Sequence, residues 1–203
     1  MGLKHQAVSA RKWRSAIRQV ERHFPAHLPP LLFLTDPDRT PDPIAAIKTL
    51  PEGSGVIYRH FGSSDRFETG ARIAAVCRAR KLSFLIAADP SLAAALEADG
   101  VHWPEKQLHH ARHWRGYFQI QTASAHSRRA ISRAAQAGMD AVLVSAVFPS
   151  RSPSAGVPLG AARLRRLSRI AQLPLYGLGG VSESNAARIA NRAGLSGISG
   201  IAG

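Results

Sequence analysis

Short apolar runs alternate with alanine-rich, helix-like stretches along most of the chain, and this alternation constrains the fold more than any other feature. Eight runs are expected to be strands, at residues 31–35, 55–59, 83–87, 100–103, 117–121, 141–145, 175–178 and 197–201. Strands that alternate with helices are typical of βα units, whose strands run parallel. No G-x-G-x-x-G follows the first run, so a closed barrel is favoured over an open doubly wound sheet. The sequence therefore predicts an α/β protein that is a single (β/α)8 TIM barrel.

Helix starts and ends support this division of the chain. Thr40 precedes Pro41 and Asp89 precedes Pro90, which places a capping side chain before a proline suited to the first helical position. Gly138 and Gly194 are well placed to end two helices. Beyond the two capped starts, helices are expected at about residues 65–80, 125–137, 159–171 and 183–193.

The N-terminal part, residues 1–28, precedes the expected barrel domain at 29–203 and is expected to form a helical extension, with its helix at roughly 9–23. Because the chain stops at the eighth predicted strand, the last helix of the barrel is expected to be missing. The N-terminal helix could cover the exposed part of the barrel instead. The alternative is that this basic segment is an arm that reaches elsewhere.

The net charge of +14 is the one unusual bulk property. It permits attraction of anionic ligands or non-specific binding to nucleic acid. Arginines at helical spacing are more typical of solvated helix faces, and the few aromatic residues are not interleaved with basic ones, so nucleic acid is not expected as a partner. The arginines concerned are Arg128, Arg129, Arg133, Arg163, Arg165, Arg166 and Arg169.

The compartment is expected to be the cytoplasm. Cys77 is the single cysteine, which excludes an intramolecular disulfide, and its apolar neighbours suggest a buried helix face. The sequence contains no apolar stretch of about 18 residues or more, so no membrane span is predicted.

A glycine pair follows the seventh predicted strand. Gly179 and Gly180 would let an oxyanion approach backbone N–H groups, and Ser182 is a candidate N-cap for a following helix whose dipole would favour negative charge. The loops after strands seven and eight are the frequent phosphate site of TIM barrels. The alternative is that the two glycines only form a tight turn.

Four stretches in order carry a resemblance to a known family. They are 98–102 (ADGVH), 124–126 (SAH), 137–141 (AGMDA) leading into 147–149 (VFP), and 177–185 (GLGGVSESN). Together they resemble the thiamine phosphate synthase and TenI family, over roughly residues 31–203. The resemblance implies a barrel that joins a hydroxymethylpyrimidine pyrophosphate to a thiazole phosphate, with release of pyrophosphate and with Mg2+ as cofactor. Its partners would be small phosphorylated heterocyclic ligands, and a homo-oligomer is possible.

The resemblance assigns candidate catalytic residues. The family's basic cluster after strand two keeps only Arg59, and Ser124 matches a serine near the reacting pyrophosphate. Ser124 could equally cap the following helix. Arg151 could replace the lysine of a hydroxyl-rich segment after strand six. His126, Ser150 and Ser152 join Gly179, Gly180 and Ser182 as candidate substrate-binding residues.

The metal ligands that the resemblance implies are incomplete. The family's Asn-Asp pair falls on Ala88 and Asp89, so one carboxylate remains, and that carboxylate could instead cap the helix that starts at Pro90. Glu105 could supply a second ligand. Hard cations such as Mg2+ need oxygen ligands, and one carboxylate makes a poor site.

Three functions remain open. The first is synthesis of thiamine phosphate, and the second is a barrel that binds a thiazole or thiamine phosphate with a regulatory role. TenI-like tautomerase chemistry belongs with this second function, but its histidine position reads Ala146, so His60 or His126 would have to move the proton. The third is nucleic-acid binding through surface charge.

Overall fold

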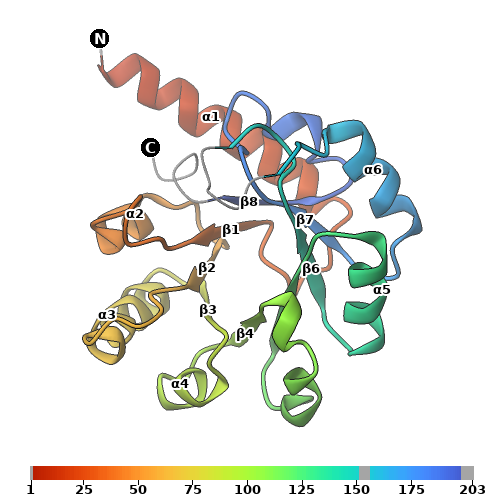
Figure 1. Ribbon diagram of the computed structural model, residues 1–203. Helices are drawn as coiled ribbons and strands as arrows, with labels where there is room; N and C mark the ends of the chain where they lie inside the picture. The colour runs from red at the N-terminus through yellow and green to blue at the C-terminus, as the bar shows by residue number, and fades with distance from the viewer. Residues whose placement is uncertain (1, 151–155, 198–203) are drawn as a thin grey trace.

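The computed structural model describes residues 2–150 and 156–197, and for residues 2–11 it describes the backbone alone. Eight strands close into a parallel barrel in chain order, and β8 completes the ring by pairing with β1 at Leu32 and Ser196 (Figure 1). The strands are β1 Leu31–Leu34, β2 Gly55–Tyr58, β3 Ser83–Ala87, β4 Gly100–Trp103, β5 Ile120–Ala125, β6 Ala141–Val144, β7 Leu175–Gly177 and β8 Gly194–Gly197. The predicted (β/α)8 barrel is confirmed.

Helices surround the ring of strands (Figure 1). They are α1 Gly2–Glu21, α2 Pro43–Thr49, α3 Arg66–Ala79, α4 Pro90–Ala95, α5 Arg128–Gln136 and α6 Ala161–Ile170, with short 3-10 turns η1 Glu105–Gln107, η2 His110–Trp114 and η3 Ala186–Arg188. Cys77 lies buried in α3, as predicted, and burial raises the pKa of its thiol to about 12. The arginines of α5 and α6 singled out above are exposed, in agreement with solvated helix faces.

Local capping explains several helix boundaries. Asp89 Oδ1 accepts a hydrogen bond from Leu92 N at 2.9 Å and starts α4 as predicted. The predicted cap at Thr40 is wrong, because the carboxylate of Asp42 accepts from Ala45 N and starts α2. Gly138 ends α5 with a φ of +80°, a left-handed backbone conformation that glycine adopts without steric strain.

Two strand predictions were misplaced. Residues 117–121 were expected as strand five, but β5 runs from Ile120 to Ala125, since Tyr117 packs edge-on against Trp114 and Phe118 outside the sheet. Strand eight was expected at 197–201, whereas β8 starts at Gly194. The predicted helix at 183–193 is only the turn η3, so the chain returns to the barrel earlier than expected. Residues 198–203 lie outside the described part of the chain.

The N-terminal segment closes one side and one end of the barrel. Helix α1 lies between α2 and α6 in Figure 1 and contacts β8 and η3, with Trp13, Ile17 and Val20 buried against them. After α1, Leu28 enters the barrel interior, and the Tyr176 hydroxyl of β7 donates to Pro29 O at 2.6 Å. The segment that precedes β1 therefore contributes to the core of the barrel. Of the residues that the structure describes, none belongs to a helix long and apolar enough to cross a membrane.

Replacing Tyr176 with Phe should reduce the free energy of unfolding by about 1–3 kcal/mol, because the buried Pro29 carbonyl loses its donor. Urea unfolding followed by circular dichroism measures the change. Tyr117→Phe is the matched control, since Tyr117 is 64% exposed and its loss of a hydroxyl should be neutral. Equal stability of the two variants would contradict the role given to the Tyr176 hydroxyl.

Candidate functional site

The barrel interior combines apolar and polar side chains. Alternate residues of each strand point inward. The inward positions of β1, β2, β3 and β6 carry Leu32, Leu34, Ile57, Leu85 and Leu143. The inward positions of β4 and β5 carry a polar set instead: His102, Thr122 and Ser124. This side of the interior is therefore where polar chemistry can occur.

His102 connects the polar set. Its Nδ1 lies 2.9 Å from Thr122 Oγ1, and its Nε2 lies 2.9 Å from Ser124 Oγ. Burial lowers the pKa of His102 to about 3, and the positive charge of Arg59 acts in the same direction. The imidazole is therefore neutral at pH 7 and holds both hydroxyls. Ser124 belongs to this row, whereas the cap of α5 is Ser127, so the capping alternative for Ser124 is wrong.

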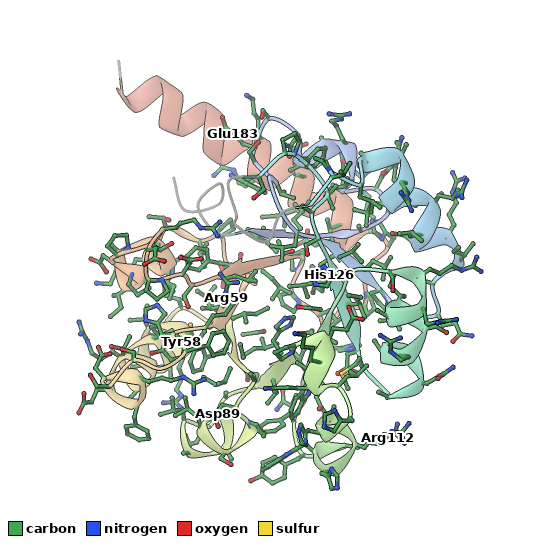
Figure 2. The ribbon with its side chains drawn as sticks, viewed as in Figure 1. Tyr58, Arg59, Asp89, Arg112, His126 and Glu183 are labelled. Atoms are coloured by element: carbon green, nitrogen blue, oxygen red, sulfur yellow. The ribbon has the colours of Figure 1, made fainter. Side chains whose placement is uncertain are left out.

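Arg59 follows the last residue of β2 and continues its inward positions. Its Nε donates to Thr35 O at 2.9 Å, and its Nη2 donates to Asp36 Oδ2 at 3.2 Å. Burial lowers the pKa of Arg59, and the neighbouring Asp36 opposes that effect. In Figure 2 Arg59 and Asp89 lie on the same side of the barrel, and His126 lies across from them. Arg59 is thus a positive charge held by the ends of β1 and β2.

His126 lies at the end of β5. Its Nδ1 is 3.3 Å from Ser145 Oγ, and its backbone N–H donates to Glu105 Oε2 at 3.2 Å. Ser145 follows the last residue of β6. The ends of β5 and β6 therefore bring a second imidazole–hydroxyl pair to the same end of the barrel as Arg59.

Gly179 and Gly180 adopt left-handed backbone conformations, with φ values of +88° and +65°. A Cβ on Gly179 would lie 2.9 Å from the Ala146 Cβ, and one on Gly180 would collide with the Pro149 carbonyl oxygen. Phe148 N donates to Gly179 O at 3.0 Å, which joins the loops after β6 and β7. Within the described residues, the N–H groups of Gly179 and Gly180 donate no hydrogen bond.

The helix expected after this glycine pair does not form. Ser182 does not cap an α-helix, because the next element is the single turn η3 and its cap position is Asn185. Asn185 instead holds the loop: its Nδ2 donates to Gly180 O at 2.8 Å, and its Oδ1 accepts from Ser182 N at 3.0 Å. Any anion binding here depends on loop N–H groups without support from an α-helix dipole.

The two candidate metal ligands do not form a Mg2+ site. Asp89 uses Oδ1 as the α4 cap and Oδ2 in an ion pair with Arg66 Nη1 at 2.7 Å. Glu105 pairs with Arg133 Nη2 at 2.6 Å. Among the described side chains, those of residues 12–150 and 156–197, no group of three or more His, Cys, Asp or Glu is placed to hold a metal ion. Mg2+ is usually held by one or two carboxylates together with waters and substrate phosphates, and both carboxylates predicted for it here are engaged by arginines, so they do not fit the ion as they stand.

The hydroxyl-rich segment after β6 is described only in part. Ser150 is its last described residue, and Arg151 and Ser152 lie outside the described residues, so their proposed roles in binding remain predictions.

Sequence reasoning missed His102, Thr122 and Arg66. Strand five was placed too early, which put Thr122 and Ser124 beyond its end and hid their inward alternation. With the observed boundaries, the spacing of two between Thr122 and Ser124 indicates one face of a strand, opposite His102 of β4. Nothing in the spacing of Arg66 and Asp89 indicates their ion pair, because they are 23 positions apart and start different helices.

The low pKa of His102 should make the protein less stable in mild acid. In the unfolded chain a histidine takes up a proton near pH 6.5, whereas folded His102 stays neutral to about pH 3, so protons favour unfolding between these values. The free energy of unfolding should therefore fall by about 2 kcal/mol between pH 7 and pH 5 because of this residue.

Urea unfolding at the two pH values, compared between the wild type and His102→Gln, measures this contribution. On acidification from pH 7 to pH 5, the free energy of unfolding of the variant should fall by about 2 kcal/mol less than that of the wild type. Parallel pH profiles for the two proteins would show that His102 titrates normally in the folded state.

Comparisons with known proteins agree with this geometry. The family model described as thiamine monophosphate synthase matches residues 33–203. A thiamine-phosphate synthase of Bacillus velezensis is 32% identical over 120 residues, which span 55% of this chain and 53% of that protein. One of Alcanivorax borkumensis is 31% identical over 145 residues, which span 67% of each. The chain thus spans about half the length of the first relative and two thirds of the second.

Solved structures show the same fold. The thiamine phosphate pyrophosphorylase of Pyrococcus furiosus superposes with a TM-score of 0.71 at 22% identity, over 83% of this chain and 85% of that one. The YdjI aldolase of Escherichia coli superposes with a TM-score of 0.58 at 11% identity, over 90% of this chain and 78% of that one. Such identities establish the barrel alone. With the family model matched over residues 33–203, the chain belongs to the thiamine monophosphate synthase family.

Proposed function

We propose that this protein acts in thiamine biosynthesis by joining a hydroxymethylpyrimidine pyrophosphate to a thiazole phosphate. The bond between the pyrimidine methylene carbon and the pyrophosphate oxygen breaks, and the methylene carbon bonds to the thiazole ring. Pyrophosphate leaves with the electron pair of the broken bond. Family membership supports the reaction, and the observation that carries it is the buried row Thr122–His102–Ser124 beside Arg59.

In this proposal the polar row orients one donor toward the leaving group. With the proton of the neutral imidazole on Nε2, Thr122 Oγ1 donates to Nδ1, and Nε2–H donates to Ser124 Oγ. The Ser124 hydroxyl proton is then free to donate to a pyrophosphate oxygen. A fixed donor and the Arg59 guanidinium would stabilise the charge that gathers on the leaving group.

The thiazole phosphate would bind at the other side of the mouth. The N–H groups of Gly179 and Gly180 are available there, and the loop is held by Asn185 and by the Phe148–Gly179 hydrogen bond. The backbone leaves no room for a Cβ at Gly179 or Gly180. Such an arrangement suits a small anion that approaches main-chain donors.

A second candidate is a barrel that binds a thiazole phosphate or thiamine phosphate without turnover. The observation that favours it is the engagement of both candidate metal ligands, Asp89 and Glu105, by arginines. Incubation with both substrates, followed by chromatography for thiamine phosphate, separates the two candidates. Absence of product, together with a rise in melting temperature on adding thiazole phosphate, would favour binding alone.

Replacing Ser124 with Ala should reduce kcat roughly ten- to a hundredfold, because the leaving group loses a hydrogen bond that strengthens as charge develops. Steady-state kinetics measure the change. Ser132→Ala is the control, since Ser132 is exposed on α5 and its loss should leave kcat unchanged. Full activity of the Ser124 variant would rule out the proposed donor.

Replacing Gly179 with Ala should remove the thermal stabilisation by thiazole phosphate, because the new Cβ displaces the loop from Ala146. Gly53→Ala is the matched control: Gly53 also has a positive φ, +75°, but no atom lies within 4 Å of the position that its Cβ would take. Thermal shift with and without the ligand tests both variants. Equal ligand stabilisation in the two would place the phosphate elsewhere.

A further inference from the structure

Asp89 is the carboxylate on which a divalent cation would be expected, and both its oxygens are occupied by protein donors. Oδ1 accepts from Leu92 N at 2.9 Å, and Oδ2 accepts from Arg66 Nη1 at 2.7 Å. A carboxylate that caps a helix and pairs with a guanidinium at these distances has a donor on each of its two oxygens. The cation bound to Asp89 is therefore a side chain of the same protein.

Arg66 is held firmly in this position. It is the first residue of α3, and its Nη2 also donates to Ala87 O at the end of β3 at 3.2 Å. Its side chain is only 20% exposed, and the Phe61 ring lies 5.7 Å from its Cζ. A guanidinium held at the end of β3 and at the start of α4 needs little reorganisation to receive an anion.

Arg66 also retains unused donors. Nε is buried and has no hydrogen-bond partner in the described part of the chain. A buried N–H without a partner costs free energy, which a ligand oxygen or a water molecule would recover. Figure 2 shows Arg59 and Asp89 on the same side of the barrel. Because Arg66 contacts Asp89 and Ala87 O, the two guanidinium groups lie at the ends of the adjacent strands β2 and β3.

His60 follows Arg59 in the chain, and the charges of Arg59 and Arg66 both act on its imidazole. Burial lowers the pKa of His60, and the charges of Arg59 and Arg66 act in the same direction, against Asp65 and Asp36. Its Nε2 is also buried without a hydrogen-bond partner among the described residues. This corner of the barrel thus contains two guanidinium groups, each paired with one carboxylate, and two buried nitrogen atoms without a hydrogen-bond partner among the described residues.

We infer that the Arg66 guanidinium takes the place of a divalent cation on Asp89, and that Arg59 and Arg66 bind the diphosphate end of the substrate without a metal ion. The inference rests on the proposed function for the identity of the substrate, and its ligand chemistry is a diphosphate. Arginine suits this task because its planar N–H groups match phosphate oxygens and its charge is permanent.

The two roles of Asp89 predict opposite effects of one substitution. Asn keeps the helix cap through its one carbonyl oxygen, but its Nδ2 cannot accept from Arg66, so the ion pair and the negative charge are both lost. If Asp89 pairs only with Arg66, then in Asp89→Asn the Ala87 carbonyl still holds Arg66 and a charge that repels the ligand is gone, so affinity for inorganic pyrophosphate stays equal or rises. If Asp89 holds a metal ion, the same variant loses affinity, and the loss appears only when Mg2+ is present.

Isothermal titration calorimetry of the full chain with inorganic pyrophosphate, in EDTA and in Mg2+, tests the inference. We expect binding in EDTA, unchanged or tighter binding by Asp89→Asn, and roughly ten- to hundredfold weaker binding by Arg66→Gln that Mg2+ does not restore. Arg66→Lys keeps the charge and should retain part of the affinity. Asp42→Asn, which changes the equivalent cap of α2, should bind as the wild type does.

Binding of pyrophosphate that requires Mg2+, or a loss of affinity in Asp89→Asn that appears only with Mg2+, would overturn the inference. The same protein, assayed for thiamine phosphate, keeps this result separate from the proposed function. Metal-free binding without product would refute the synthase and support the inference. Product formation with Mg2+-dependent binding would refute the inference alone.

Discussion

Closing eight short parallel strands into a ring directs every second side chain into one narrow interior, and the remaining features of the site follow from that packing. The interior is filled mainly by leucine and isoleucine, so each polar group inside needs a partner from a neighbouring strand. His102 meets this need with Thr122 and Ser124 of the adjacent strand, and its imidazole is neutral as a result of burial. The same packing that stabilises the barrel therefore orients the candidate catalytic serine.

The charged residues at the strand ends obey the same requirement. Arg59 pairs with Asp36, and Arg66 pairs with Asp89, so each half-buried guanidinium has a carboxylate beside it. Such pairs limit the cost of burying charge. They also occupy the carboxylate that would otherwise be free for a metal ion. Charge compensation within the fold thus bears directly on how the proposed phosphorylated ligand would bind.

Prediction from sequence succeeded where the signal is local. The apolar runs predicted the boundaries of six strands to within a residue or two of the observed ones. Asp89 before Pro90 correctly predicted the start of a helix. It failed where a tertiary contact overrides the local pattern. The aromatic residues Tyr117 and Phe118 were predicted to lie in a strand, but they pack against Trp114. The segment after Ser182 was predicted to be a helix, but it forms a single turn held by Asn185.

The sequence by itself determined the barrel, the position of the glycine pair after β7 and the candidacy of Ser124 and Arg59, because periodicity, capping and motif order are properties of neighbouring residues. Only the tertiary structure decided that His102 orients Ser124 and that Arg66 neutralises Asp89. Those partners come from different strands and helices. Barrel closure brings them within hydrogen-bond distance, and no pattern along the chain encodes that distance.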